Sequence, residues 1–347
     1  MKTVAVLELK PGMVLGEDVI FQNNTIYTAD TTLDENIILK LKRYSIMCVS
    51  IKENIDFATT HYERLIYSDR FRDFEVLYQK TLQDFYKIMQ DFINNKIPPS
   101  TDILFSMYNQ LYDKAQGGAN LLDYLFHMVP TEEEMTYSHA LSSALLAGTI
   151  ADWVSMNKEA KEIMILSGYF YDIGKFVLPS ELLWKIGKLS EAEQLSLKNH
   201  TRVGYQLIQP LEIDQHIKNT VLMHHERIDG TGYPFALKDK QIDVYAKYMS
   251  IIDAYIGMAS SRTYRSAISP LKISDYFEKN MNLYDAELLL PVMRKIADAQ
   301  IGTTVVLNDD SMWDVFLINS TTLSRPMLKN SNNEIINLAE RNDLSLK

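Results

Sequence analysis

The sequence predicts a mainly α-helical protein: a helical bundle with a small α+β domain at the N-terminus and a short β extension at the C-terminus. Apolar residues recur at three- and four-residue steps from about residue 60 to 300, as in helices with one buried face. Residues 1–55 and the stretch after Gly302 instead contain short apolar and β-branched runs between turn residues. We expect an α+β module at 1–55, a helical connector at 56–120, a metal-binding helical domain at 121–300 and an antiparallel β tail at 301–347.

The first 55 residues contain four runs typical of strands and one segment typical of a helix. The strand runs are VAVLEL, MVLGEDVIF, TIYTA and MCVSI, and Pro11-Gly12 and Asn23-Asn24 separate the first three. The helical segment DENIILKLKRY has Asp34 and Glu35 in its first turn, where acidic side chains complement the helix dipole. This pattern predicts a small α+β fold.

The segment from residue 60 to 95 has a continuous apolar stripe at helical spacing. Its members are Phe71, Phe74, Tyr78, Leu82, Phe85, Met89 and Phe92. One interpretation is a long helix packed on the rest of the same chain. The alternative is a coiled-coil-like seam, which would make a homodimer through the 60–95 helix. Pro98-Pro99 ends the helix, and Ser100 or Thr101 can cap the next one.

The composition excludes several classes of protein. The 347 residues include 45 Asp and Glu against 35 Lys and Arg, a net charge of −10, which argues against DNA or RNA as a partner. Cys48 is the one cysteine, so an internal disulfide and a zinc site of paired cysteines are excluded. We expect Cys48 to be a small buried apolar residue, as cysteines commonly are.

No segment of the sequence has the features of a membrane span or a secretory signal. The apolar run at the N-terminus is interrupted by Glu8 and followed by Lys10 and Pro11. No run approaches the roughly 20 apolar residues that a membrane helix needs. We therefore expect a soluble, cytoplasmic protein with no membrane partner.

Six polar side chains stand in apolar helices or at their ends. They are His139, Asp172, His200, His224, His225 and Asp253. Each by itself has an ordinary explanation, a hydrogen-bonded core histidine or a capping aspartate. Together they are costly to bury unless something pairs with them, and a divalent metal ion would pair with all of them. Nitrogen and oxygen ligands suit Fe, Mn or Zn better than Ca or Mg, and a set without cysteine favours a catalytic centre over a structural one.

Four blocks in a fixed order resemble the HD-GYP family of the HD phosphohydrolase superfamily, over about residues 125–300. The blocks are GYFYDIGKFVLPSELLWKIGKLSEAE, NHTRVG, HHERIDGTGYP and IIDAYIGMASSRTYR. The segment ELKPGMVLGEDV also resembles the family's common N-terminal module, and IGTTVVLNDDSMWDVFLINSTTLSRPMLK resembles its β tail. In the first block, Gly174 reads as the end of the helix KEIMILSGYF.

The resemblance implies a metal-dependent phosphodiesterase of cyclic di-GMP, active in bacterial signalling. By this resemblance, the six polar residues above match the family's metal ligands. Asp172 would bridge two ions that activate water and bind the phosphate. Asp172 and Lys175 match catalytic positions, Lys175 and Arg262 match residues that contact the substrate phosphates, and Tyr233 matches a ring beside the nucleotide. The cofactor expected is one or two divalent ions, Fe or Mn favoured over Zn. His61, His127 and His216 read as structural or surface residues.

The sequence departs from the family where a histidine should precede Asp172. Tyr171 stands there, and a phenol with a pKa near 10 does not normally replace an imidazole on a divalent ion. One metal position would then keep His139, Asp172 and Asp253, and the other would keep Asp172, His200, His224 and His225. We expect the second to be occupied and the first to be weak or empty. Ile256 and Met135 also replace acidic residues of some family members, so a three-metal centre is not expected.

Three functional hypotheses follow. The chain binds metal and cyclic di-GMP or a related nucleotide, with hydrolysis weakened or lost through Tyr171. Alternatively it is a non-catalytic nucleotide sensor or protein-interaction module with a signalling protein as partner. A further alternative is an active metal-dependent phosphohydrolase, acting on another nucleotide or through a phenolate-ligated ferric ion.

Overall fold

The computed structural model describes residues 2–6, 9–21, 24–29, 31–44, 46–52, 65, 68–131, 133–183, 185, 187–260, 268–330 and 332–347. The chain divides into two compact units, Met1–Ser68 and Asp69–Lys347. Arg262 and His61, two residues singled out in the sequence, lie outside the described residues. In the described part of the chain, no helix combines the length and the apolar composition that crossing a bilayer requires.

The first unit has the predicted α+β composition. Its elements are β1 (Lys2–Ala5), β2 (Val19–Phe21), β3 (Asn24–Tyr27), α1 (Glu35–Arg43) and β4 (Cys48–Ile51). The strands form two antiparallel pairs, β1 with β4 and β2 with β3. Asp34 caps α1 by accepting the Ile37 N–H, so it precedes the first turn instead of lying in it.

The prediction that Cys48 is buried is wrong. Cys48 is exposed at the start of β4, whereas Val49 and Ile51 point into the core of the unit. Side chains alternate between the two faces of a strand, so burial of the stronger apolar residues turns Cys48 outward.

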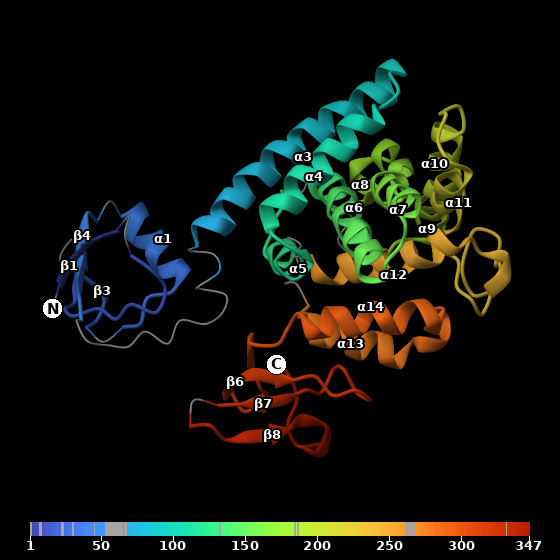
Figure 1. Ribbon diagram of the computed structural model, residues 1–347. Helices are drawn as coiled ribbons and strands as arrows, with labels where there is room; N and C mark the ends of the chain where they lie inside the picture. The colour runs from blue at the N-terminus through green and yellow to red at the C-terminus, as the bar shows by residue number, and fades with distance from the viewer. Residues whose placement is uncertain are drawn as a thin grey trace. The chain divides into compact units, whose positions relative to one another are not determined.

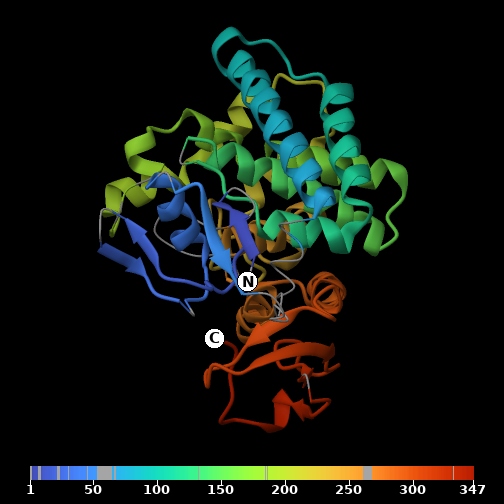
Figure 2. The same cartoon turned by 90° about the vertical axis from the view of Figure 1, so that its left-hand side faces the viewer.

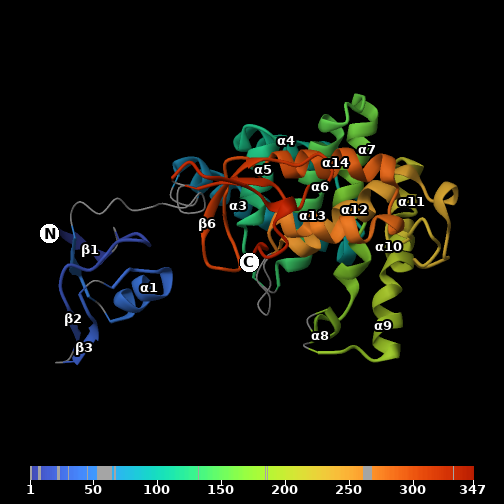
Figure 3. The same cartoon turned by 90° about the horizontal axis from the view of Figure 1, so that it is seen from below.

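The second unit is a bundle of helices followed by a small sheet (Figure 1). Its longer helices are α3 (Asp69–Asn95), α4 (Thr101–Ala115), α5 (Gly118–Phe126), α6 (Met135–Trp153), α7 (Lys158–Phe170), α10 (His200–Ile208), α11 (Gln215–Met223), α12 (Val244–Ala259), α13 (Pro270–Lys279) and α14 (Ala286–Asp298). The short helices α8 (Ser180–Leu183) and α9 (Glu191–Lys198) extend away from the bundle (Figure 3).

The apolar stripe of α3 is buried within the chain. All seven of its side chains are at most 6% exposed, and α3 packs on α4 and α6. This confirms the interpretation of a helix packed on its own chain. The stripe is therefore not free to form a coiled-coil seam with a second copy, and the homodimer expected through residues 60–95 loses its basis.

The centre of the bundle is α6, which is buried along nearly its whole length. It packs against α7 and α12, and α11 packs against α7, α10 and α12. Because α6 is surrounded, it has apolar side chains on every side. Five of its small polar residues, Thr136, Ser138, Ser142, Ser143 and Thr149, consequently lie inside the protein.

The C-terminal β tail forms as predicted. The strands β5 (Thr304–Val306), β6 (Met312–Leu317), β7 (Met327–Lys329) and β8 (Ile335–Asn337) make one antiparallel sheet in that order. Leu307, Val315 and Leu328 belong to the same apolar core as residues of α13 and α14, so the tail is part of the helical unit (Figure 2).

Candidate metal centre

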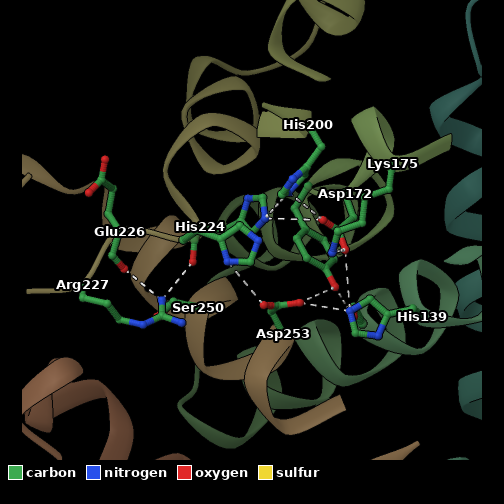
Figure 4. Close-up of polar contacts among 12 residues, drawn as sticks. His139, Asp172, Lys175, His200, His224, Glu226, Arg227, Ser250 and Asp253 are labelled. Atoms are coloured by element: carbon green, nitrogen blue, oxygen red, sulfur yellow. Dashed lines mark hydrogen bonds and ion pairs between the residues drawn. The ribbon is translucent and has the colours of Figure 1, made fainter. Parts of the chain in front are cut away.

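Six polar side chains from five segments of the second unit meet beside α6 (Figure 4). They are His139 of α6, Asp172 after α7, His200 at the start of α10, His224 and His225 after α11, and Asp253 of α12. They form two groups that share Asp172. The four-residue group is Asp172, His200, His224 and His225, and the three-residue group is His139, Asp172 and Asp253; in each, ligand atoms lie within 4.8 Å of one another.

Gly174 makes this meeting possible. It lies in the 3-10 helix η2 (Ile173–Val177), where a Cβ atom would come 1.9 Å from the backbone oxygen of His200. Only glycine allows η2 to approach α10 this closely, and that approach brings Asp172 to His200. The prediction that Gly174 ends a helix is wrong: α7 ends at Phe170, and Gly174 serves a contact distant in sequence.

The four-residue group presents unprotonated nitrogen atoms to a carboxylate. His200 Nδ1 lies 2.6 Å from Leu197 O, and His224 Nδ1 lies 3.1 Å from Val221 O, so each Nδ1 donates its proton to a backbone carbonyl. The two Nε2 atoms are 3.3 Å apart, and they lie 3.2 and 3.5 Å from Asp172 Oδ1. Three acceptors thus converge on one point.

Asp172 Oδ1 is the atom that best fits a metal ligand. It is buried and has no hydrogen-bond partner among the described residues. A buried carboxylate oxygen without a donor costs several kcal/mol in free energy of folding, on the order of a lost charge-assisted hydrogen bond. The donor set of one carboxylate oxygen and imidazole nitrogens fits Fe, Mn or Zn, and the carbonyls behind His200 and His224 orient the rings as in known metal sites.

The three-residue group is supplied with donors by the protein itself. Lys175 Nζ donates to Asp172 Oδ2 at 2.6 Å, and His139 Nε2 lies 3.1 Å from Asp253 Oδ1. Tyr171 also donates its hydroxyl to Asp253 Oδ1 at 3.4 Å and lies 3.1 Å from Ser143 Oγ. Asp172 therefore directs one oxygen to each group, and the two oxygens have different surroundings.

Burial and neighbouring charges keep these groups in the protonation states that this geometry needs. Burial raises the pKa of Tyr171 well above 10, and the charges of Asp172 and Asp253 raise it further, so the phenol stays neutral. Burial alone would raise the pKa of Asp172, but the ammonium group of Lys175 holds it well below its usual range. Burial lowers the pKa of His200 and His225, which favours the neutral imidazole that binds metals.

The carboxylate of Asp253 is likewise kept ionised. Burial acts to raise its pKa, but the hydrogen bond with His139 and the nearby His225 and Lys175 lower the pKa below its usual range. The centre thus contains two carboxylates and, from the described lysines and arginines, one cationic group within hydrogen-bond distance, the ammonium of Lys175. A cation held by Asp172 would balance this excess of negative charge.

A cleft of about 370 Å³ opens onto the three-residue group. His139, Asp172, Lys175 and Asp253 line it, together with Thr136 and Ser138 of α6. The side chains of His200 and His224 are fully buried behind it. The cleft is of a size that binds small molecules, and the Lys175 ammonium is positioned to meet an anion there.

Tyr233 lies against the histidines of the four-residue group. Its ring stacks on His225 with centroids 4.6 Å apart, and Lys198 Nζ lies 5.2 Å from the ring centroid. Gly232 has no room for a side chain, because a Cβ atom would come 2.4 Å from Glu226 Cα. The loop that contains Gly232 and Tyr233 therefore folds tightly onto the residues that follow His225.

Two residues that the sequence analysis did not single out hold this loop. Glu226 is 2% exposed, and its carboxylate accepts the backbone N–H groups of Phe235 and Leu237 at 2.8 and 2.9 Å. Arg227 donates to the backbone oxygens of His224 and Glu226 (Figure 4). The signal in the sequence was a glutamate and an arginine directly after two histidines.

The remaining predicted residues lie outside the two groups. His216 is half exposed and pairs with Asp243 at 2.7 Å, and His127 lies 3.6 Å from Asp123. Glu134, next to the buried Met135, accepts the Thr131 N–H and hydroxyl, so its carboxylate serves the turn before α6.

Comparisons with known proteins relate this chain to the HD domain and to phosphodiesterases of cyclic dinucleotides. Residues 120–288 match the family model of the HD domain. The 3′3′-cGAMP-specific phosphodiesterase 1 of Vibrio cholerae is 27% identical over 196 residues, which are 56% of this chain and 43% of that protein. The cyclic di-GMP phosphodiesterase PA4108 of Pseudomonas aeruginosa is 26% identical over 200 residues, 57% of this chain and 48% of that protein.

The matched region therefore spans less than half the length of either phosphodiesterase. Among solved structures, Bd1817, an HDG"Y"P protein from Bdellovibrio bacteriovorus, superposes with a TM-score of 0.50 at 16% identity, covering 86% of this chain and 98% of that one. At this identity the similarity concerns the fold.

Proposed function

We propose that this chain binds a divalent metal ion and a cyclic dinucleotide, with hydrolysis weakened or lost through Tyr171. The match of residues 120–288 to the HD domain and the similarity to two cyclic-dinucleotide phosphodiesterases support this proposal. The observation that supports this most is the different surroundings of the two Asp172 oxygens. Oδ1 faces imidazole nitrogens without a donor, whereas Oδ2 already receives the Lys175 ammonium. The four-residue group thus requires a cation. The three-residue group has a weaker need for one, because Lys175 already neutralises its Asp172 oxygen.

The metal ion would be held by Asp172, His200, His224 and His225, with Fe or Mn favoured and Zn as an alternative. When bound, it supplies a Lewis acid that polarises a phosphate group and makes a nearby water more acidic. The chain's own residues bind and orient the ligand. Lys175 offers an ammonium group to a phosphate in the cleft, and Arg262 and Tyr233 are the further residues proposed to contact the nucleotide.

Cyclic di-GMP is the ligand proposed first, because proteins similar to this chain act on cyclic di-GMP or on 3′3′-cGAMP. Asp172 and Lys175 would act directly on the reaction if hydrolysis survives. The Tyr171 hydroxyl donates a hydrogen bond to Asp253 Oδ1, which favours a neutral phenol over a phenolate-ligated ferric ion. Cleavage that needs two ions is therefore expected to be slow or absent.

Metal analysis of the purified protein, together with cyclic di-GMP binding and turnover assays, tests this proposal. We expect one ion per chain, binding of the dinucleotide and little linear product. His200→Gln is expected to remove the ion, because His200 is fully buried in the four-residue group. His216→Gln, at a half-exposed histidine paired with Asp243, is the control that keeps it. Two ions with rapid turnover, or no ion at all, would contradict the proposal.

A further inference from the structure

The hydroxyl of Tyr78 connects α3 to the turn of α6 that contains His139. It lies 2.8 Å from Ser138 Oγ and 2.9 Å from Ser142 Oγ, and it donates to Ser138 O at 3.3 Å. Tyr78 is fully buried, and both serines are at most 6% exposed. One phenol thus contacts two successive turns of the metal-centre helix.

These contacts lie immediately beside the site. Ser138 precedes His139 and lines the cleft, and Ser142 follows His139 by three residues, about one helical turn. Apolar packing between α3 and α6 allows small sliding movements, whereas hydrogen bonds with defined directions fix the position of one helix on the other. The position of the Tyr78 hydroxyl therefore determines where His139 stands relative to Asp253, whose Oδ1 is 3.1 Å from His139 Nε2.

The helix α3 is also the segment that follows the first unit directly along the chain. That unit ends at Ser68 and α3 begins at Asp69. Any change in the first unit that moves α3 along its axis would act on α6 through Tyr78. We propose that Tyr78 is a positioning residue that couples the placement of α3 to His139, and so controls the three-residue group; its relevance to ligand binding rests on the function proposed above.

The test uses ring-nitrogen NMR signals of the seven histidines in the metal-free full chain. The His139 signals are assigned by their loss in His139→Gln. Tyr78→Phe is expected to shift the His139 signals and leave those of His216 in place. The α6 serines can turn their hydroxyls back to carbonyls of their own helix, so the variant is expected to fold.

Tyr169→Phe is the matched control. Tyr169 is also fully buried, and its hydroxyl donates to the backbone oxygen of Leu104, away from α6. An unchanged His139 signal in Tyr78→Phe, or an equal shift in Tyr169→Phe, would overturn the proposal. Ser142→Ala removes a partner of the phenol from the other side, and it is expected to shift the His139 signals in the same way even if Tyr78→Phe does not fold.

A second measurement relates the inference to the ligand. Tyr78→Phe is expected to weaken cyclic di-GMP binding by about two- to thirtyfold, the range found for residues that couple distant sites, while the metal affinity of the four-residue group is retained. Loss of that metal affinity as well would mean general damage and would contradict a role specific to His139. If the wild-type chain binds neither metal nor dinucleotide, the proposed function fails, whereas the NMR comparison still decides whether Tyr78 positions His139.

Discussion

Tyr171 lies beside the three-residue group, at the position where the resemblance to the HD-GYP family would place a histidine. Its hydroxyl is satisfied by Ser143 and Asp253, and its ring lies edge-on to His224 with centroids 4.9 Å apart. The residue is thus integrated into the core as a neutral hydrogen-bond donor. Its hydroxyl donates a hydrogen bond to Asp253, the carboxylate that a metal ion in this group would otherwise contact.

We predict that Tyr171→His raises the metal content from one ion towards two and increases turnover of cyclic di-GMP. An imidazole there would add a nitrogen ligand beside His139, Asp172 and Asp253. Metal analysis and product assays on the purified variant check this.

Tyr171→Phe serves as the companion variant, because it removes the hydroxyl without adding a ligand. It is expected to keep one ion and nearly the wild-type activity, with a loss of about 1 kcal/mol in stability from the missing hydrogen bonds. A complete loss of activity in Tyr171→Phe would instead show that the phenol takes part in catalysis or metal binding.

Among the elements, the short helix η2 depends most strictly on one residue. Gly174 within it touches the backbone of α10 so closely that a methyl group has no space. We predict that Gly174→Ala separates η2 from α10 and destabilises the protein by about 2–3 kcal/mol, as overpacking does. Because the same movement takes Asp172 away from His200, metal affinity should fall as well.

Gly257→Ala on α12 is the control for this substitution. Its new Cβ would meet only the His139 ring, at 4.0 Å, which is ordinary contact. Chemical denaturation and metal titration of both variants measure the difference. Equal stabilities and equal metal affinities would show that η2 tolerates the methyl group.

Most helices and strands could be predicted from the sequence because their signals are local. The stripe of α3 and the runs of the β tail follow the periods of a helix and a strand. Gly174 and Glu226 could not be interpreted in this way, since their partners, His200 O and the N–H groups of Phe235 and Leu237, come from the folded arrangement. The exposure of Cys48 could not be predicted either, because it depends on which face of β4 turns inward.

For the site, the sequence predicted the six polar residues, and the structure brings them together in the two expected groups. The sequence could not show that each carboxylate of the three-residue group receives a donor from the protein. That result depends on two contacts, Lys175 with Asp172 Oδ2 and Tyr171 with Asp253 Oδ1. The spacing of residues along the sequence does not specify which carboxylate oxygen a side chain reaches.

At the scale of the molecule, the proposed metal ion would join segments that lie far apart in the sequence. We predict that manganese or ferrous ion raises the melting temperature of the metal-free chain, because a ligand bound to the folded state alone stabilises it by about 2.7 kcal/mol at a hundredfold excess over its dissociation constant. Thermal unfolding with and without a chelator measures this.

The same titration on His200→Gln is expected to show no stabilisation, whereas His216→Gln should behave as the wild type. Equal metal-dependent shifts in all three proteins would mean that the ions bind elsewhere on the chain.

The two groups also differ in when they can form during synthesis. The three-residue group needs both His139 and Asp253, which are separated by 114 residues, so it can form only after Asp253 has emerged. The ligands of the four-residue group all precede Asp253 in the sequence, so they leave the ribosome before Asp253 does. An ion bound at that stage would hold Asp172 in place before Asp253 emerges. The three-residue group would then form around a carboxylate that already binds the ion.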